Sequence, residues 1–365
     1  MRILLLINWK IRYCNEIPND LQPSDYDCPQ ELFWFFRYFK EKPVVDVVDI
    51  RAPKWIEWVE NKLRFHFFQT LRVLRKLNKY DLIFVHGTTS AMLLGAIKRV
   101  FRMKTPPILD VDISSFRQAS TKGIIHKLSQ FSSKEFDYLV YHTSSQIAYY
   151  KEQFPWLADK CEFVPLGVDY DYWKTKSYPV IPEKDSYIVC VGYRKRDWDT
   201  LIKAYNQAKI KEKLYLIGNP DLKCDNPDVK VMPFIPIDEL MTYIANAKFS
   251  VIPLDDFNYS FGQLTLLQQM ASGIPILAAD VRAIRDYISQ SKGAVSYKPY
   301  DAEDLAEKLM QMSALSSESM QKMAADNIEA VKTSLSEQRM AERFEKICRK
   351  LACTEDKETM EMHEW

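Results

Sequence analysis

The sequence predicts an α/β protein with two doubly wound parallel sheets. Short apolar runs alternate with segments of helical periodicity, a pattern typical of parallel strands that helices cover on both faces. This alternation stops once, over residues 168–185, and then restarts. The length of 365 residues also suits two domains better than one core. We expect two sheets whose carboxyl edges face each other across a cleft, with one ligand per domain.

Six apolar runs in the first half predict six strands. The first, RILLLI at residues 2–7, has an apolar core too short for a secretory signal. The other expected strands are residues 44–50, 81–87, 106–113, 137–143 and 161–167. Residues 29–41 (PQELFWFFRYFKE) and 89–101 (TSAMLLGAIKRVF) are typical of the helices between them.

Residues 168–185 contain two prolines and mixed charge without periodicity, so we expect a linker between domains. The second half then repeats the α/β pattern. Its expected strands are residues 186–193, 213–219, 229–235, 249–255 and 273–281. Its expected helices are residues 197–208, 237–247, 263–273, 301–312 and 335–352.

The composition excludes several classes of protein. A net charge of +1 gives no field that would select nucleic acid. Seven cysteines form no CxxC, and five histidines show no ligand spacing, so we expect reduced thiols and no metal site. No stretch reaches the roughly 20 apolar residues of a membrane span. We therefore expect a cytoplasmic protein, with peripheral contact at the inner face of the membrane as an alternative.

That alternative rests on the first half of the chain. Residues 1–169 hold 24 Lys and Arg against 19 Asp and Glu, which suits either an anionic membrane or an ordinary solvated surface. Residues 54–79 (KWIEWVENKLRFHFFQTLRVLRKLNK) mix Trp, Phe and Leu with cations. This mixture is typical of an interfacial helix, and equally of a helix that covers a sheet.

The stretch SFGQLTLLQQMASGIPIL, residues 260–277, predicts an anion site at the start of a helix. Gly262 has no side chain, so a phosphate can approach the free amides and positive dipole end of the helix. Ser260 and Thr265 add hydroxyl groups, whereas Gly273 and Pro275 end the helix. The same residues are compatible with a plain tight turn.

A second signal lies in VGYRKRDWDTL, residues 191–201. Three cations, Arg194, Lys195 and Arg196, follow Gly192 and precede an acidic first turn of a helix. Cations near a helix start are unfavourable unless an anion lies between them. Because arginine donates to two phosphate oxygens at once, the loop predicts a clamp on a diphosphate. A basic loop in solvent is the alternative.

Five motifs together resemble GT-B fold glycosyltransferases of the large retaining group often called family 4, or glycosyl transferases group 1. In order, they are GVDYDYW, VGYRKRDWDTLIKAY, LYLIGN, VKVMPFIPIDELMTYIANAKFSVIPL and SFGQLTLLQQMASGIPILAADV. The resemblance is specific in the second half and limited to the strand–helix rhythm in the first. It implies Rossmann-like domains at 1–172 and 183–336, a helix at 337–353 packed back on the first domain, and a frayed tail at 354–365.

The resemblance implies that the second domain binds a nucleoside diphosphate sugar. Arg194 and Arg196 fall on positions that grip the diphosphate, and these are the expected catalytic residues. Phe234 and Ile235 fall on the loop beside the base. The complete expected donor-binding set is Gly192, Lys195, Gly218, Asn219, Phe234, Ile235, Ser260, Phe261, Gly262, Gln263, Leu264, Thr265 and Gln268.

The chain departs from the family at two glutamates spaced E-x7-E, whose positions hold Ser260 and Gln268. Gln268 could still bind the ribose hydroxyls through its amide. Ser260 is shorter and neutral, which leaves the identity of the donor sugar open.

The first domain lacks the family's paired glycines after its first strand. Asn8, Trp9 and Lys10 stand there and either line the cleft or pack against their neighbours. Asp112 stands at a position where many relatives place a residue that faces the acceptor. His86, after another strand, is expected to be a hydrogen-bonded polar residue and not a catalyst.

The implied reaction moves a sugar from a nucleoside diphosphate sugar to an acceptor hydroxyl with retention, as in hexosyltransferases of glycan or surface polysaccharide synthesis. Since cations and amides can stabilise the leaving diphosphate, we expect no metal or other cofactor. The expected acceptor is a glycan or a lipid-linked molecule. Because both glutamates are absent, an inactive sugar-nucleotide-binding protein stays open as an alternative. A sugar-nucleotide epimerase is another, since that chemistry also uses two facing α/β domains.

Overall fold

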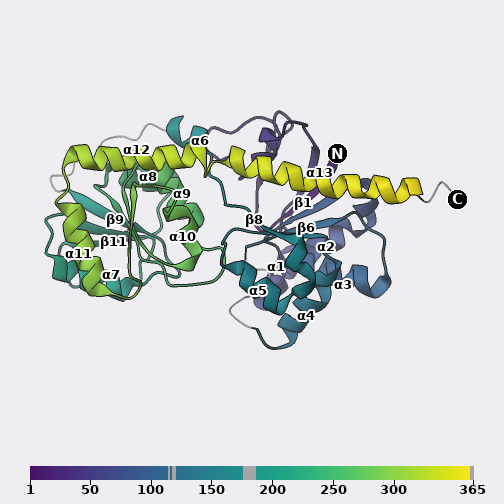
Figure 1. Ribbon diagram of the computed structural model, residues 1–365, viewed down its shortest axis with the longest axis horizontal. Helices are drawn as coiled ribbons and strands as arrows, with labels where there is room; N and C mark the ends of the chain where they lie inside the picture. The colour runs from purple at the N-terminus through teal and green to yellow at the C-terminus, as the bar shows by residue number, and fades with distance from the viewer. Residues whose placement is uncertain (114–115, 117–120, 176–185, 362–365) are drawn as a thin grey trace. The chain divides into compact units, whose positions relative to one another are not determined.

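The structure, a computed structural model, describes residues 1–113, 116, 121–175 and 186–361 (Figure 1). The chain forms two compact units. The first comprises Met1–Pro165 and Met340–Trp365, and the second comprises Leu166–Arg339. The expected linker at 168–185 differs in part, because it begins with helix α6 (Tyr170–Thr175) of the second unit. Residues 176–185 lie outside the described residues.

The first unit contains a six-stranded parallel sheet in the order β4-β1-β5-β6-β7-β8, so all six strands expected in this half are confirmed. They are β1 (Arg2–Ile7), β4 (Val44–Val48), β5 (Leu82–His86), β6 (Ile108–Asp112), β7 (Tyr138–Tyr141) and β8 (Cys161–Phe163). The two-residue strands β2 (Arg12–Tyr13) and β3 (Tyr26–Asp27) pair separately. The central strands β5 and β6 are buried throughout, as helices on both faces require.

Short helices surround this sheet. The α-helices are α1 (Lys54–Leu63), α2 (Phe68–Val73), α3 (Ser90–Phe101), α4 (Ile124–Ser132), α5 (Gln146–Gln153) and, from Met340 onward, α13 (Glu337–Glu361). The 3₁₀ helices are η1 (Trp34–Tyr38), η2 (Leu74–Lys79), η3 (Ser133–Glu135) and η4 (Pro155–Lys160). Helix α13 continues to Glu361, although a frayed tail was expected from residue 354.

The helix expected at residues 29–41 is reduced to the 3₁₀ helix η1. Four consecutive aromatic residues, Phe33 to Phe36, are all buried, whereas an amphipathic helix on a sheet buries one face only. Phe35 instead stacks on Phe344 of α13, with ring centroids 5.1 Å apart. Phe36 packs edge-on against Phe84 of β5. The aromatic side chains of this run therefore pack against partners on different sides.

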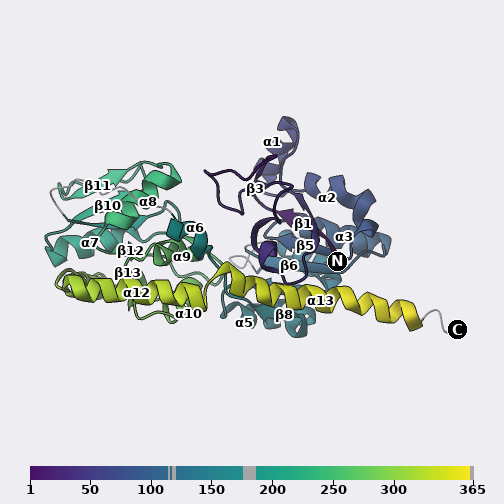
Figure 2. The same cartoon turned by 90° about the horizontal axis from the view of Figure 1, so that it is seen from above.

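The second unit has a parallel sheet in the order β11-β10-β9-β12-β13-β14. Its strands are β9 (Tyr187–Val191), β10 (Lys213–Ile217), β11 (Val229–Met232), β12 (Ser250–Ile252), β13 (Ile276–Ala279) and β14 (Ala294–Tyr297). Its further helices are α7 (Trp198–Ala208), α8 (Ile237–Asn246), α9 (Gln263–Ala271), α10 (Arg282–Ile288), α11 (Ala302–Ser313) and α12 (Ser317–Thr333). Helix α7 packs with α11, and α9 packs with α10 and α12 (Figures 1 and 2).

Each sheet has one point where the order of strands reverses. In the second unit, the chain builds outward from β9 to β11 and then returns to the other side of β9 with β12. In the first unit, the corresponding reversal lies between β1 and β5. Both sheets are therefore doubly wound, as predicted, and ligands of such sheets bind where the order reverses, beyond the carboxyl ends of the strands.

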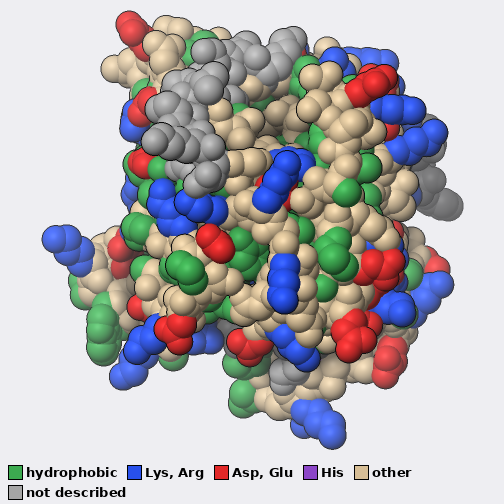
Figure 3. Space-filling model, turned by 90° about the vertical axis from the view of Figure 1, so that its left-hand side faces the viewer, with side chains coloured by type: hydrophobic (Ala, Val, Ile, Leu, Met, Phe, Trp, Pro, Cys, Tyr) green, Lys and Arg blue, Asp and Glu red, His purple; other side chains and the backbone are tan. Residues whose placement is uncertain are grey.

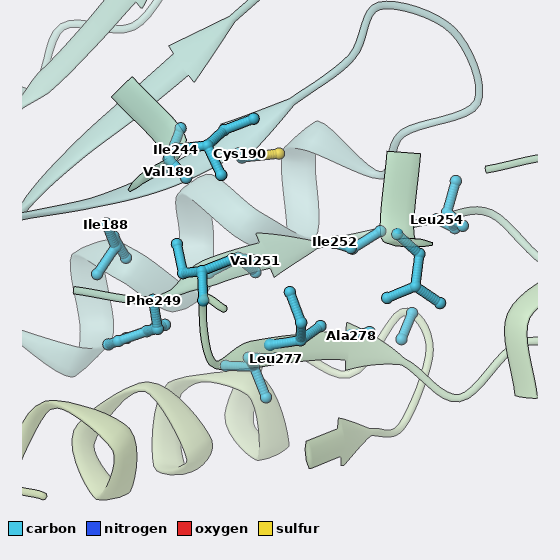
Figure 4. Packing of buried hydrophobic residues seen from close by; sticks show 14 of the residues in the cluster. Ile188, Val189, Cys190, Ile244, Phe249, Val251, Ile252, Leu254, Leu277 and Ala278 are labelled. Atoms are coloured by element: carbon cyan, nitrogen blue, oxygen red, sulfur yellow. The ribbon is translucent and has the colours of Figure 1, made fainter. Parts of the chain in front are cut away.

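A continuous apolar core supports the reversal point of the second unit (Figure 4). Val189 and Cys190 of β9 lie next to Val251 and Ile252 of β12, and all four side chains are buried. Leu254 follows β12 and is also buried. The loops that leave these two strands are therefore attached to rigid, close-packed elements.

The surface carries charges of both signs. On the face shown in Figure 3, Lys and Arg side chains alternate with Asp and Glu side chains. This mixture agrees with the net charge of +1 for the whole chain. Among the described residues, no helix combines the length and the apolar character that crossing a bilayer requires.

Candidate functional site

The loop after β9 places one arginine beneath a glycine at the reversal point of the second sheet. Gly192 has a φ of +134°, and a Cβ there would lie 2.7 Å from Nη2 of Arg196. Arg196 is only 8% exposed. Its Nε donates to the carbonyl of Val191 and its Nη1 to that of Arg194, both at 3.2 Å. The glycine therefore makes room for a buried guanidinium.

The charge of Arg196 has no carboxylate in ion-pair contact among the described residues. Burial lowers the pKa of Arg196, and the nearby Cys190 and Asp255 only partly oppose this effect. A buried cation that lacks an ion pair is costly, and a bound anion would offset this cost. By contrast, Arg194 and Lys195 are exposed to solvent.

Leu254 connects this loop to the start of α9. Its backbone forms an antiparallel bridge with Arg196. Asp197 N, next along the first loop, donates to the carbonyl of Pro253 at 2.8 Å. The side chain of Leu254 lies against Gly262, where a Cβ would come within 2.6 Å of its Cδ1. The structure thus joins the two predicted phosphate-binding features at one sheet edge.

The start of α9 is open to a ligand, whereas the start of α7 is not. Asp197 caps α7 by accepting a hydrogen bond from Thr200 N at 3.1 Å. Helix α9 begins after Gly262 with a φ of +84°, no side-chain cap and no acidic residue in its first turn. Leu264, in that turn, is exposed. The first amides of α9 therefore lack a partner from a capping side chain.

Lys195 and Asp255 border the same reversal point. Lys195 has a left-handed backbone with φ of +59°, and its carbonyl accepts from Asp255 N at 3.3 Å. Its Nζ lies 4.0 Å from the ring centroid of Phe257. Burial and the neighbouring Asp197 raise the pKa of Asp255, while Lys195 and Arg196 lower it. Both residues therefore contribute to the electrostatics of the site.

Residues that follow β10 and β11 extend the site along the carboxyl edge of the sheet, away from β12. Gly218, with φ of +107°, follows β10, and a Cβ there would lie 3.4 Å from the carbonyl oxygen of Gly192. Asn219 is buried and Ile235 is partly buried. Phe234 is exposed and meets the ring of Tyr193 edge-on at 5.7 Å. This aromatic pair offers a surface against which a planar base could pack.

Two expected donor-binding side chains are engaged within the protein instead. The Oγ of Ser260 donates to Oε1 of Gln263 at 3.2 Å, and Nε2 of Gln263 donates to the carbonyl of Ala283 at 2.7 Å. Both side chains are buried. In the structure these side chains tie the loop before α9 to helix α10, and their contact with a donor stays a prediction.

The remaining expected residues lie near the same loop or along α9. Phe261, Thr265 and Gln268 are partly buried. Asp256, which the sequence analysis did not include, binds Arg282 through Nε at 3.1 Å and through its backbone N at 3.0 Å. Burial raises the pKa of Asp256, but the bonds to Arg282 outweigh this effect and lower the pKa below its usual value. Asp256 therefore fixes the start of α10, and its sequence position alone contained no signal for that role.

In the first unit, the three expected acceptor-side residues have protein partners. Asn8 Nδ2 donates to the carbonyl of Gly87 at 3.0 Å, across the reversal point of that sheet. Lys10 forms an ion pair with Glu57 at 2.9 Å. Asp112 is fully buried and accepts from the hydroxyl of Tyr150 at 2.6 Å. A ligand could reach Asp112 only after this packing had rearranged, so its position indicates a structural role.

The sequence did not predict a cluster of aromatic rings and histidines at the reversal point of the first sheet. His86 packs edge-on against Trp9 and Trp34, with ring centroids 5.4 and 4.9 Å apart, and the two Trp rings also contact each other. Neither ring nitrogen of His86 has a hydrogen-bond partner among the described residues. The expectation that His86 is hydrogen-bonded is therefore wrong. Burial lowers the pKa of His86 to about 3 and that of His142 to about 4. Both rings are neutral near pH 7.

Among the residues that the structure describes, no group of three or more His, Cys, Asp or Glu side chains could hold a metal ion. All seven cysteines are free thiols.

One comparison by sequence finds a match within the second unit. Residues 185–314 match the family model of Glycosyl transferases group 1. No curated protein sequence matches the chain significantly.

Solved structures with a similar fold cover nearly the whole chain. Sucrose-phosphate synthase from Thermosynechococcus elongatus is 16% identical, with a TM-score of 0.66, covering 97% of this chain and 100% of that one. Alr3699/HepE from Anabaena, in complex with UDP, is 13% identical with a TM-score of 0.65, covering 96% and 100%. α,α-Trehalose 6-phosphate synthase from Burkholderia multivorans is 11% identical with a TM-score of 0.65, covering 97% and 99%. These likenesses confirm the fold, which is that of GT-B glycosyltransferases.

Proposed function

We propose that this protein transfers a sugar from a nucleoside diphosphate sugar to an acceptor hydroxyl. The match of residues 185–314 to the model of Glycosyl transferases group 1 supports this proposal. The donor binds at the reversal point of the second sheet. Its diphosphate lies between Arg196 and the first amides of α9, and its base packs near Phe234. The anomeric configuration is retained, and the acceptor is a glycan or a lipid-linked molecule.

The observation that carries this proposal is the buried charge of Arg196. Its guanidinium is held under Gly192, donates to two carbonyls, and has no carboxylate in ion-pair contact among the described residues. The uncapped start of α9 is joined to the same place through Leu254. A fixed cation and open amides at one sheet edge favour a ligand with two adjacent negative groups.

The same groups can stabilise the reaction. As the bond between the sugar and the diphosphate stretches, negative charge grows on the leaving oxygen. Arg196 and the amides of Gln263–Thr265 would stabilise that charge without reorganising, because packing already holds them in place. Arg194 and Lys195, which are exposed, can approach the outer oxygens of the diphosphate. These cations would provide the stabilisation without a metal ion.

Uridine is the first base to test. Structures of the Anabaena protein with a similar fold contain UDP, UDP with glucose, and UDP-glucose. The seven free thiols suit a reducing compartment, so we place the reaction in the cytoplasm.

A non-catalytic sugar-nucleotide-binding protein is the second candidate function. It is favoured by Ser260 and Gln268, which replace the two expected glutamates, and by the hydrogen bond that directs Ser260 toward Gln263. In that case the donor would bind at Arg196 without turnover.

Incubation of the purified protein with UDP-, GDP-, ADP- and TDP-sugars separates these functions. Release of nucleoside diphosphate, slow without an acceptor and faster with one, supports transfer. Binding without release supports the non-catalytic candidate, and a free epimer supports an epimerase. Arg196→Ala should lower turnover by about two to three powers of ten. Lys203→Ala, which removes an exposed cation of α7, is the matched control and should retain the full rate.

A further inference from the structure

Helix α1 leaves three of its five apolar side chains, Trp55, Trp58 and Leu63, exposed to solvent, although it buries a charged one. Its buried residues are Ile56 and Glu60. Glu60 accepts hydrogen bonds from Phe67 N and Phe68 N at 2.7 and 2.8 Å, and so supports the start of α2. Trp55 and Trp58 are 71% and 64% exposed. Packing of the first unit does not explain why these two indole rings point into solvent.

Helix α4 also exposes apolar side chains, and the residues that it buries are polar. Its buried residues are His126, Ser129 and Ser132. Four of its five exposed residues are apolar: Ile124, at 84% exposure, Ile125, Leu128 and Phe131. Two helices of one unit thus expose several large apolar side chains. This arrangement is expected of helices whose apolar sides meet a partner.

A groove lies where the end of α1 meets α3 and α4. It has a volume of about 230 Å³ and is lined mainly by Leu63, Phe65, Met92, Ile125 and Leu128. We call this groove, together with the exposed residues of α1 and α4, the α1–α4 apolar surface. The C-terminal end of α3 lies close to it, since the guanidinium of Arg99 lies 5.1 Å from the ring centroid of Phe131.

The chain around this surface is strongly basic. Residues 54–134 contain 15 Lys and Arg against 5 Asp and Glu. Three of the acids, Glu60, Asp110 and Asp112, are buried. Glu57 pairs with Lys10, and Asp81 accepts from Arg2 N at 2.7 Å. Few free anions therefore remain near the apolar side chains.

Two cations accompany the apolar side chains of α1 and α4. Lys62 lies over the ring of Trp58, with Nζ 5.2 Å from the centroid. Lys127 is exposed on α4, in sequence next to Leu128. Tryptophan and lysine side chains beside apolar residues are typical of segments that lie in the interface of a bilayer.

We propose that the α1–α4 apolar surface docks the first unit on an anionic lipid bilayer, with the groove receiving part of an acyl chain. Trp55, Trp58 and Ile124 enter the interface, and Lys62 and Lys127 contact lipid phosphates. A second copy of the chain is a poor occupant, because a symmetric pair would bring two basic surfaces together. This partner goes beyond the proposed transfer reaction and does not depend on it.

Co-flotation of the full-length protein with vesicles tests the proposal. We expect it to float with vesicles of phosphatidylcholine containing 30 mol% phosphatidylglycerol, and at least tenfold less with phosphatidylcholine alone or in 0.5 M NaCl. The combined variant Trp55→Ser/Trp58→Ser and the variant Ile124→Ser should each lower partitioning at least tenfold. The matched control is Ile17→Ser/Val44→Ser, which removes two exposed apolar side chains of the same unit elsewhere and should partition like wild type.

Three results would overturn the proposal. The first is failure of the wild-type protein to float with anionic vesicles. The second is equal loss of flotation in the control variant. The third is a concentration-dependent dimer in analytical ultracentrifugation that Ile124→Ser abolishes, because the surface would then bind a second copy. Tryptophan quenching by brominated lipid, lost in Trp55→Ser/Trp58→Ser, would support docking independently, and neither readout requires turnover.

Discussion

The guanidinium of Arg196 lies directly against the backbone of Gly192. A Cβ at Gly192 would come within 2.7 Å of Nη2 and 2.8 Å of Nε. The guanidinium is also fastened to the carbonyls of Val191 and Arg194. The position of this charge therefore depends on the absence of a side chain at Gly192, and a single added methyl group should displace the guanidinium.

Gly192→Ala should weaken binding of a nucleoside diphosphate at least tenfold, because the added methyl group pushes Arg196 out of its place. Isothermal titration calorimetry measures the affinity. Gly123→Ala is the control: Gly123 also has a positive φ, of +97°, but a Cβ there meets nothing within 4 Å. If both variants kept wild-type affinity, the close packing of Arg196 on Gly192 would have no part in binding.

Gly262→Ala should destabilise the second unit by about 1–2 kcal/mol from its left-handed backbone alone, and by more because a Cβ would lie 2.6 Å from Leu254 Cδ1. Replacing Leu254 by the shorter alanine should relieve the steric part of this cost. In a double-mutant cycle with Leu254→Ala, followed by urea unfolding, we expect the combined cost to be smaller than the sum of the single costs. Additive costs would show that Leu254 does not contact this position.

Asp110→Asn should raise the stability of the first unit increasingly as pH rises from 4 to 8. Both carboxyl oxygens of Asp110 are buried and have no hydrogen-bond partner within the described part of the chain, and burial together with Asp112 raises the pKa of Asp110 well above the usual value. A carboxyl whose pKa is higher in the folded state stabilises folding fully only below its unfolded pKa, and this stability is lost as pH rises through the folded pKa. Thermal melts at pH 4 and pH 8 measure the difference, and an equal shift at both would contradict the account.

His86→Phe should make the first unit less sensitive to acid. The folded pKa of His86 is about 3, so protonation favours the unfolded chain as pH falls below its unfolded pKa of about 6.5. At pH 5 this difference costs wild type about 2 kcal/mol, whereas phenylalanine keeps the ring packing against Trp9 and Trp34 without a proton to bind. The free energy of unfolding should therefore differ between wild type and His86→Phe more at pH 5 than at pH 8. The opposite order would show that His86 is not a buried neutral ring.

Local patterns predicted most of the fold, because a buried parallel strand is a continuous apolar run whatever its neighbours are. The six strands of the first sheet and five of the second were recognised in this way. The last strand, β14 (Ala294–Tyr297), was missed because two of its four residues are only partly buried and one is exposed, which leaves no apolar run. Helix η1 was mistaken for a regular helix because its partners, Phe84 and Phe344, are distant in the sequence.

The candidate site was predictable where glycine or charge made a local pattern, as at Gly192, Arg196 and Gly262. It was not predictable where side chains find distant partners. The bond from Gln263 to Ala283 spans 20 residues, and that from Tyr150 to Asp112 spans 38. Such contacts decide whether a polar side chain faces a ligand or supports the fold, and a linear pattern does not contain them.

The central claim is that Arg196 binds the diphosphate of the donor. Isothermal titration calorimetry of the nucleoside and of its diphosphate, for the base that binds best, measures the increment in affinity due to the two phosphates. We expect Arg196→Met, which removes the charge, to lose most of this increment while nucleoside binding stays unchanged, and Lys203→Met to keep it. An undiminished increment in folded Arg196→Met would contradict the account.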